Sequence, residues 1–290
     1  MPDRDPLRPS PDEAYDAWAA RVRANREQVG RLREVPDPGD FYAPVSGLFR
    51  ADPRRDDEPT LDQLRSLARP EDSWLDIGAG AGRYALPLAL AVREVIAVEP
   101  SAGMAAALRE GMAEHGITNV RIVEGGWPPD APTTGRPIAE RPRADVALIA
   151  HLGYDIEPIG RFLDAMEAAA GRLCVAVLME RQPASIADPF WPIVHGEERI
   201  QLPALPEFLV VLVARGRSFE VRLSERRPRP FENVEQAASF LRRQLWIAEG
   251  GAKDRVFLAA LVERVVERDG QVFLADQRPL PIGLVSWRPR

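Results

Sequence analysis

Cysteine is almost absent from this chain of 290 residues, since Cys174 is the only one. A single cysteine excludes an internal disulfide, and its scarcity fits a reducing compartment, so we expect a cytoplasmic protein. Cys174 lies within an apolar run, where a buried small hydrophobic side chain is the simplest interpretation.

Histidine and lysine are also scarce, with three residues and one residue respectively. His195 stands near Glu197 and Glu198, but so few histidines make a metal site improbable, and we expect no metal. The formal net charge is −6, whereas proteins that bind nucleic acid usually carry more basic than acidic residues. A long RNA or DNA partner is therefore not expected.

Long apolar runs are missing as well. None approaches the ~20 residues that a membrane-spanning helix needs. The N-terminal residues Met1–Pro6 lack the apolar centre of a signal peptide. We expect no membrane segment.

From Ser73 onward the chain alternates between strand-like and helix-like segments. Apolar runs predict strands at Ser73–Ile77, Glu94–Val98, Val120–Val123, Ala144–Ala150 and Leu173–Met179. Helices are predicted between them at Arg83–Ala91, Ala102–His115 and Pro158–Ala170. Strands that are apolar nearly throughout and separated by helices predict a parallel sheet covered on both faces.

Further elements flank this alternation. Helices are predicted from Pro11 to about Glu34 and at Leu61–Ala68, Leu205–Ala214, Val234–Ala248 and Asp254–Arg268, strands at Phe219–Leu223 and Ile282–Trp287, and a loop at Arg181–Pro203. We divide the chain into an N-terminal tail and helical cover (1–60) and an α/β domain (61–290). The domain has a core (61–180), an insertion (181–215) and C-terminal strands with a helical insertion (216–290).

The most informative stretch follows the first predicted strand. An acid, Asp76, precedes three glycines on alternate positions, Gly78, Gly80 and Gly82, and the second strand is followed by Glu99. Glycines permit positive φ and close approach of a ligand to the backbone. The helix after them offers free N–H groups to an anion, and an acid after the second strand can accept hydrogen bonds from ribose hydroxyls. The pattern indicates an adenosine-bearing cofactor.

Two cofactors compete for this pattern. Gly80 to Ala85 also satisfies the G-x-G-x-x-G/A fingerprint of a dinucleotide, with Glu99 about twenty residues further on. Asp76 separates the alternatives, because it would repel a pyrophosphate but favour a cationic amino group. An NAD-dependent oxidoreductase therefore stays the weaker alternative.

At these residues the chain resembles the class I S-adenosylmethionine-dependent methyltransferases, whose D/E-x-G-x-G-x-G motif matches Asp76–Gly82. The resemblance covers about Leu61 to Glu180 and implies S-adenosylmethionine (SAM) as cofactor. It implies a Rossmann-like, doubly wound α/β fold with a seven-stranded, mostly parallel sheet, whose last strand pairs antiparallel at the sheet end. It also implies the cofactor-binding residues Asp76, Gly78, Ala79, Gly80, Gly82, Arg83, Glu99, Pro100, Met104 and His151. We add Gly126 and Trp127 as candidate cofactor contacts.

One departure from the family concerns the adenine. The family commonly places an acid after the third strand, where this chain has Gly126. Backbone groups of 125–127 or the Trp127 ring are the alternatives for holding the adenine. Packing against loop prolines is an equally good interpretation of Trp127.

The acceptor should lie beyond the first and fourth strands. His151 and Tyr154 follow the fourth strand and are candidate catalytic residues, His151 as a base or as a contact to the cofactor. The chain lacks the Asn/Asp-Pro-Pro-Tyr/Phe motif of amino-methylating nucleic-acid enzymes, and its single cysteine excludes a two-cysteine mechanism on RNA. A small molecule or a protein side chain is therefore favoured as the acceptor, and we expect a small molecule methylated on O, N or C.

Candidate substrate contacts are Tyr42, Tyr154, Trp191 and His195, although burial explains the aromatic residues at least as well. A SAM-binding protein without methyl transfer stays an alternative. We expect a monomer or a homodimer.

Overall fold

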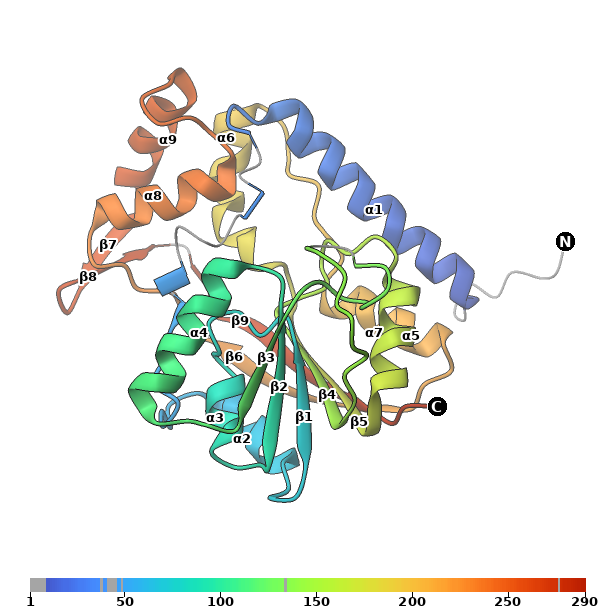
Figure 1. Ribbon diagram of the computed structural model, residues 1–290. Coiled ribbons are helices and arrows are strands. Elements are labelled where there is room, and N and C mark those ends of the chain that lie inside the picture. Colours follow the sequence, from blue (N-terminus) through green and yellow to red (C-terminus); the bar gives the residue numbers. More distant parts are fainter. Residues whose placement is uncertain (1–8, 37–38, 41–45, 48, 133–134, 276) are drawn as a thin grey trace, which may run out of the picture.

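The computed structural model describes residues 9–36, 39–40, 46–47, 49–132, 135–275 and 277–290. Figure 1 shows a central sheet with helices on both faces and a group of helices above one end of the strands.

A seven-stranded sheet forms the centre of the molecule. Its strands are β1 (Ser73–Ile77), β2 (Glu94–Glu99), β3 (Val120–Glu124), β4 (Ala144–Ala150), β5 (Ala170–Met179), β6 (Phe219–Arg226) and β9 (Leu280–Trp287). The order is β3-β2-β1-β4-β5-β9-β6. Strands β1 to β5 pair in parallel, and β9 pairs antiparallel with both neighbours. The expected doubly wound, mostly parallel sheet is confirmed, but the antiparallel last strand lies inside the sheet, with β6 at its edge.

Helices cover the two faces as separate layers. One face packs against α1 (Pro11–Leu32), α5 (Ile159–Ala169) and α7 (Leu205–Ala214), and the other against α2 (Pro59–Leu67), α3 (Ala85–Ala89) and α4 (Ala102–His115). Successive strand residues alternate between the layers, as in β1, where Leu75 joins the first layer and Trp74 the second. Both faces are apolar because both are buried.

The ends of two helices follow from their sequences. Ser10 caps α1 by accepting a hydrogen bond from the backbone N of Glu13 (3.3 Å), while the Glu13 carboxylate accepts one from the Ser10 backbone N (3.0 Å). Ser101 caps α4 through the backbone N of Met104 (3.1 Å), and Gly116 ends that helix with φ +64°.

A smaller group of elements forms a cap beyond the strand ends. It consists of the 3-10 helix η2 (Pro183–Phe190) and helices α6 (Trp191–His195), α8 (Val234–Leu245) and α9 (Ala252–Val262), which share one apolar cluster. Figure 1 places these helices above the sheet, next to the end of α1. The segment 181–203, expected to be a loop, thus contains two short helices.

The predicted helix Asp254–Arg268 is wrong in its second half. Helix α9 ends at Val262, and β7 (Val265–Arg268) pairs antiparallel with β8 (Gln271–Leu274). Asp269 and Gly270 between them have φ +51° and +73°. An Asp-Gly pair with two positive φ values is typical of a tight hairpin turn, and this signal outweighs the helical pattern.

Helix α1 is hydrogen-bonded to two segments that lie beyond the carboxyl ends of the strands. The Trp18 indole N–H donates to the carbonyl of Ile156 (2.8 Å), in the segment between β4 and α5. Asn25 donates to the carbonyl of Ile200 (2.5 Å), beyond α6. The helix therefore holds the segment after β4 and the segment after α6 against each other.

Across the helices of the described residues, no segment combines the length and the apolar character needed to cross a membrane.

The buried carboxylate of Glu167 on α5 contacts two arginines in the segment between α7 and β6 and a tryptophan of β9. It accepts hydrogen bonds from the Nε of Arg217 (2.9 Å) and the indole N–H of Trp287 (3.0 Å), and it pairs with Arg215 (3.1 Å). Arg215 in turn donates to the hydroxyl of Tyr15 on α1 (2.5 Å). Burial opposes ionisation of Glu167, but Arg217, Arg215 and Trp287 outweigh it and hold its pKa below the usual range.

We predict that Glu167→Gln destabilises the fold, because it leaves the two buried guanidinium groups without their shared carboxylate. The expected loss in the free energy of unfolding is about 3 kcal/mol, measured by chemical denaturation at pH 7. Glu267→Gln, on the exposed β7–β8 hairpin, is the control and should change stability by less than about 0.5 kcal/mol. Equal stabilities of the two variants would show that the Glu167 cluster contributes nothing.

Candidate functional site

The glycine turn after β1 has the backbone that its sequence predicts. Gly78, Gly80 and Gly82 have φ values of +75°, +57° and +85°, a region that other residues rarely adopt. A Cβ at Gly80 would meet no heavy atom within 4 Å, so this position faces open space. The middle glycine therefore leaves room for a ligand against the backbone.

The outer two glycines serve packing. A Cβ at Gly82 would lie 2.4 Å from the Cδ1 of Leu108 on α4, and one at Gly78 would lie 2.8 Å from the Cδ2 of Leu152. Leu152 directly follows His151, so the ends of β1 and β4 pack tightly together.

Two carboxylates lie at the ends of the neighbouring strands β1 and β2. Asp76 is 2% exposed and Glu99 is 5% exposed. Burial, followed by the charge of Glu99, raises the pKa of Asp76 to about 7. A cationic group beside Asp76 would favour its charged form, so the site is suited to a ligand with a positive charge.

Glu99 is fixed by backbone donors. The backbone N of Gly80 donates to its Oε2 (2.7 Å), and the backbone N of Ser101 donates to its Oε1 (2.8 Å). Burial raises the pKa of Glu99 despite these two hydrogen bonds, and Asp40 adds to the rise. Each carboxylate oxygen has a second lone pair, which can accept a ribose hydroxyl.

The start of α4 meets the N-terminal segment. The Ser101 hydroxyl donates to Asp40 (2.8 Å), and Met104 forms a buried cluster with Ala81 and Ala107, against which Phe49 packs. The segment before α2 thus covers this side of the glycine turn.

The loop after β3 lies beside Pro100. A Cβ at Gly135 would be 2.7 Å from the Cβ of Pro100, and the Gly126 backbone N donates to the carbonyl of Arg136 (2.9 Å). The Trp127 ring is buried in the core, with its indole N–H donating to the carbonyl of Phe162 (3.4 Å).

Glu124, at the end of β3, pairs with Arg109 of α4 and lies 4.0 Å from the guanidinium of Arg136. The Glu124 carboxylate therefore already pairs with arginine side chains at the protein surface. How an adenine amino group would be held stays a prediction, with the backbone of 125–127 and the Trp127 ring as its candidates.

His151 follows β4 in an unusual conformation. Its φ is +56°, in the left-handed region, and its backbone N donates to the carbonyl of Val177 on β5 (2.8 Å). Non-glycine residues held there cost free energy and cluster at functional sites. The Nε2 of His151 lies 3.4 Å from the hydroxyl of Tyr84, in the segment between the glycine turn and α3.

Tyr84 and Glu58 are residues that the sequence interpretation missed. The Tyr84 hydroxyl donates to Glu58 (2.7 Å), which also accepts from Arg83 (2.8 Å) and Arg55 (2.7 Å). Arg83, predicted to bind cofactor, has its guanidinium on this carboxylate. Residues 54–58, two arginines followed by three acids, resemble a solvated loop, and nothing in the sequence indicates that the Glu58 side chain points into the protein.

Tyr154, the other candidate catalytic residue, is 5% exposed, and its hydroxyl accepts a hydrogen bond from the backbone N of Met179 (2.8 Å). It connects the segment after β4 to the end of β5. Its contact with a substrate stays a prediction.

The structure places the candidate substrate contacts Trp191 and His195 in the cap. Trp191 has no exposed surface, and the Arg199 guanidinium lies 4.6 Å from its ring centroid. The Nε2 of His195 lies 2.9 Å from the carbonyl of Leu245, and its Nδ1 lies 3.2 Å from the Nζ of Lys253. A substrate would reach Trp191 only if the cap rearranged. Tyr42 lies outside the described residues.

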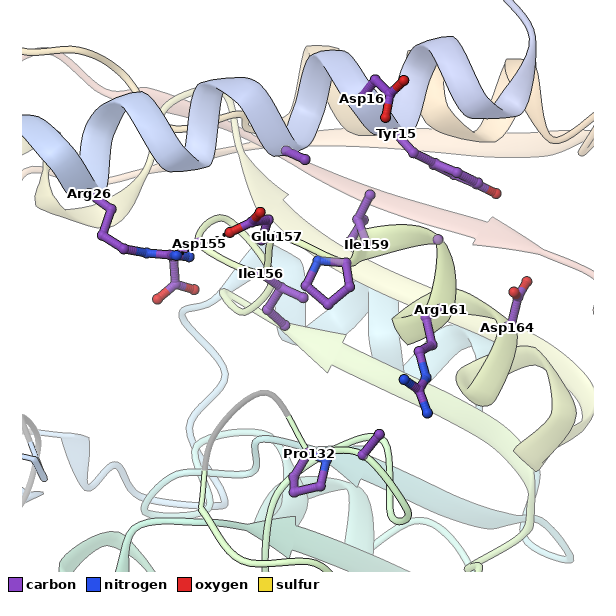
Figure 2. Close-up of a pocket in the computed structure, with 14 residues that line it drawn as sticks. Tyr15, Asp16, Arg26, Pro132, Asp155, Ile156, Glu157, Ile159, Arg161 and Asp164 are labelled. Atoms are coloured by element: carbon purple, nitrogen blue, oxygen red, sulfur yellow. Dashed lines mark ion pairs between the residues drawn. The ribbon is translucent and has the colours of Figure 1, made fainter.

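A groove of about 750 Å³ lies nearby, between α1 and the segment that joins β4 to α5. Figure 2 shows Arg26 of α1 beside Asp155 and Glu157, and Arg26 reaches Glu157 (3.0 Å). The residues that line this groove do not include the glycine turn, the two strand-end carboxylates or His151. It is distinct from the site at the strand ends.

Among the described residues, no group of three His, Cys, Asp or Glu side chains is placed to hold a metal ion.

Comparison with known proteins agrees with the geometry. A model of the "Methyltransferase domain" family matches residues 75–138. A protein-L-isoaspartate O-methyltransferase of Methanoregula boonei is 34% identical over 152 residues, which are 48% of this chain and 70% of the relative. A 23S rRNA (uracil-C5)-methyltransferase of Xanthomonas campestris is 44% identical over 55 residues, 19% of this chain and 12% of that relative.

The chain therefore spans only about an eighth of the length of the rRNA methyltransferases that it matches. Among solved structures, a SAM-dependent methyltransferase of Thiobacillus denitrificans in complex with S-adenosylhomocysteine has a TM-score of 0.52. It is 13% identical, with 88% of this chain and 100% of that chain covered, and it shares the fold. Glycine turn, strand-end acids, sheet order and sequence matches lead to one conclusion: the chain belongs to the class I S-adenosylmethionine-dependent methyltransferases.

Proposed function

We propose that the protein transfers a methyl group from SAM to an O, N or C atom of a small molecule. The observation that carries this proposal is the pair of buried carboxylates, Asp76 and Glu99, on either side of a glycine turn whose middle residue faces open space. We place the cationic amino group of the cofactor toward Asp76 and the ribose hydroxyls on Glu99.

In this reaction SAM supplies an activated methyl group on a sulfonium, and the protein mainly aligns the acceptor with it. A lone pair of the acceptor atom forms the new bond to the methyl carbon, while the carbon–sulfur bond breaks and its electrons stay on sulfur. We assign His151 to accept the proton that the acceptor loses, because imidazole titrates near neutral pH.

The acceptor is proposed from charge and architecture. The net charge of −6 disfavours a polyanionic substrate. The cap of η2, α6, α8 and α9, together with α1, occupies the side of the sheet on which the candidate site lies, which suits an acceptor small enough to be enclosed. The two curated relatives act on protein and on rRNA by their names, so both classes belong in the test as competing acceptors.

We further propose that the protein works in the cytoplasm as a monomer or a homodimer. The single buried cysteine is compatible with a reducing compartment.

The test is cofactor binding followed by transfer. Isothermal titration with S-adenosylhomocysteine should give saturable binding, and NADH should give none. Purified protein with methyl-labelled SAM should then label a small-molecule extract more than rRNA or an isoaspartyl peptide. Stabilisation by NADH alone would reject the methyltransferase assignment, and binding without any transfer would leave a cofactor-binding protein.

The affinity for S-adenosylhomocysteine should depend on pH through Asp76. The free protein has an Asp76 pKa of about 7, and a bound cationic amino group should lower that pKa. Binding then releases a proton at low pH, so affinity falls as pH decreases. Titration at pH 7.5 and pH 6.0 should give affinities that differ by about eightfold.

Asp76→Asn is the matched control for this experiment, since it keeps the shape and removes the charge. It should bind S-adenosylhomocysteine weakly and with equal affinity at both pH values, while circular dichroism shows a folded protein. Wild-type affinity that does not change with pH would contradict the placement of the amino group.

Substitutions at two of the glycines should affect different properties, cofactor binding at Gly80 and protein stability at Gly82. Gly80→Ala adds a Cβ in open space at a positive φ, so it should cost about 1 kcal/mol of stability and weaken S-adenosylhomocysteine binding at least tenfold. Gly82→Ala drives a Cβ into Leu108 and should mainly lower the melting temperature. Thermal unfolding and calorimetric titration of both variants check this; tight binding by Gly80→Ala would remove that glycine from the cofactor site.

A further inference from the structure

A chain of hydrogen bonds leads away from His151 into the protein. The His151 Nε2 lies 3.4 Å from the Tyr84 hydroxyl, and the Tyr84 hydroxyl lies 2.7 Å from the Glu58 carboxylate. The rings of Tyr84 and His151 are 6.1 Å apart, centroid to centroid. Tyr84 is 4% exposed, so water competes little for its hydroxyl.

Glu58 is held in its charged form at the end of this chain. Burial opposes its ionisation, but Arg83, the Tyr84 hydroxyl and Arg55 outweigh burial and lower its pKa. Burial and the Glu58 charge raise the pKa of Tyr84, so this phenol stays protonated at neutral pH. Four ionisable groups surround the Tyr84 side chain: Glu58, Arg55, Arg83 and His151.

These protonation states fix the direction of each hydrogen bond. An ionised carboxylate only accepts, so the single proton of the Tyr84 hydroxyl is donated to Glu58. The Tyr84 oxygen can then only accept from His151, which requires the proton on Nε2. A neutral imidazole with its proton on Nε2 carries its lone pair on Nδ1.

The backbone supports the same arrangement. His151 is held at φ +56° by the hydrogen bond from its N–H to Val177, and the neighbouring Leu152 packs onto Gly78. The imidazole is thus placed by a constrained backbone and by Tyr84 together, beside the turn that we assign to the cofactor.

We propose that Tyr84 and Glu58 are positioning residues that hold His151 in the tautomer with its proton on Nε2. This inference rests on the proposed function. When His151 takes up a proton, the imidazolium keeps its Nε2–H on the Tyr84 oxygen. The Glu58 carboxylate, one hydrogen bond further, stabilises that positive charge.

The tautomer can be measured without knowing the acceptor. The chain has three histidines, so long-range 15N–1H spectra of the imidazoles contain three spin systems, and His151→Gln identifies the one in question. Wild-type His151 should show a neutral form with the proton on Nε2. Tyr84→Phe removes only the hydroxyl and should give a mixture of the two tautomers.

Glu58→Gln tests the charge. It leaves Arg55 and Arg83 near His151 without their carboxylate, so the pKa of His151 should fall by about half a unit or more. Tyr15→Phe, on α1 with its hydroxyl on Arg215, is the matched control and should change neither the tautomer nor the pKa of His151.

S-adenosylhomocysteine binding separates this inference from the proposed function. Tyr84→Phe should bind it within about twofold of wild type, because the phenol acts on the base. A wild-type protein that does not bind S-adenosylhomocysteine would reject the proposed function whatever the spectra show. A proton on Nδ1 of wild-type His151, or an Nε2–H tautomer that Tyr84→Phe leaves unchanged, would overturn the role of Tyr84 and Glu58.

Discussion

Two carboxyl groups buried at the ends of neighbouring parallel strands are the constraint on which the site depends. Parallel pairing of β1 and β2 brings Asp76 and Glu99 to the same edge of the sheet. Glu99 is compensated by two backbone N–H groups, whereas burial and Glu99 leave Asp76 half protonated near pH 7. Such an arrangement costs stability in the free protein and is relieved by a cation. The charge of Asp76 would repel a pyrophosphate, so this one carboxylate selects between the cofactors that a glycine turn can accept.

The remaining structure supports this edge of the sheet. The outer glycines let Leu152 and Leu108 pack closely, which fixes the turn, while Gly80 keeps its approach open. Helix α1 holds the segment after β4 through Trp18, and the segment before α2 brings Glu58 onto Tyr84. The surroundings of His151 and of the glycine turn are thus assembled from parts of the chain that lie far apart in sequence.

The sheet and the cofactor turn were predictable because their signals are local. Apolar runs give the strands, and an acid followed by three spaced glycines gives the turn. The β7–β8 hairpin was also signalled, by Asp269-Gly270, but the helical pattern before it obscured that signal. The position of the antiparallel strand, between β5 and β6, depends on pairings across the whole sheet.

Other features had no local signal. Glu58 stands in a charged stretch, and only the fold shows that its carboxylate meets Tyr84 and two arginines. Trp191 and His195 formed an aromatic, histidine-bearing segment that suggested a substrate wall. In the structure the first is fully buried, and both nitrogens of the second lie close to other groups of the cap.

The central claim is that the strand-end carboxylates receive the two ends of one cofactor. A crystal structure of the complex with S-adenosylhomocysteine tests it most directly. The account predicts ribose hydroxyls within hydrogen-bond distance of Glu99, the cofactor backbone against Gly80, and the amino group on the Asp76 side of the turn. A complex in which the amino acid end of the cofactor points away from Asp76, or in which Glu99 contacts no hydroxyl, would contradict it.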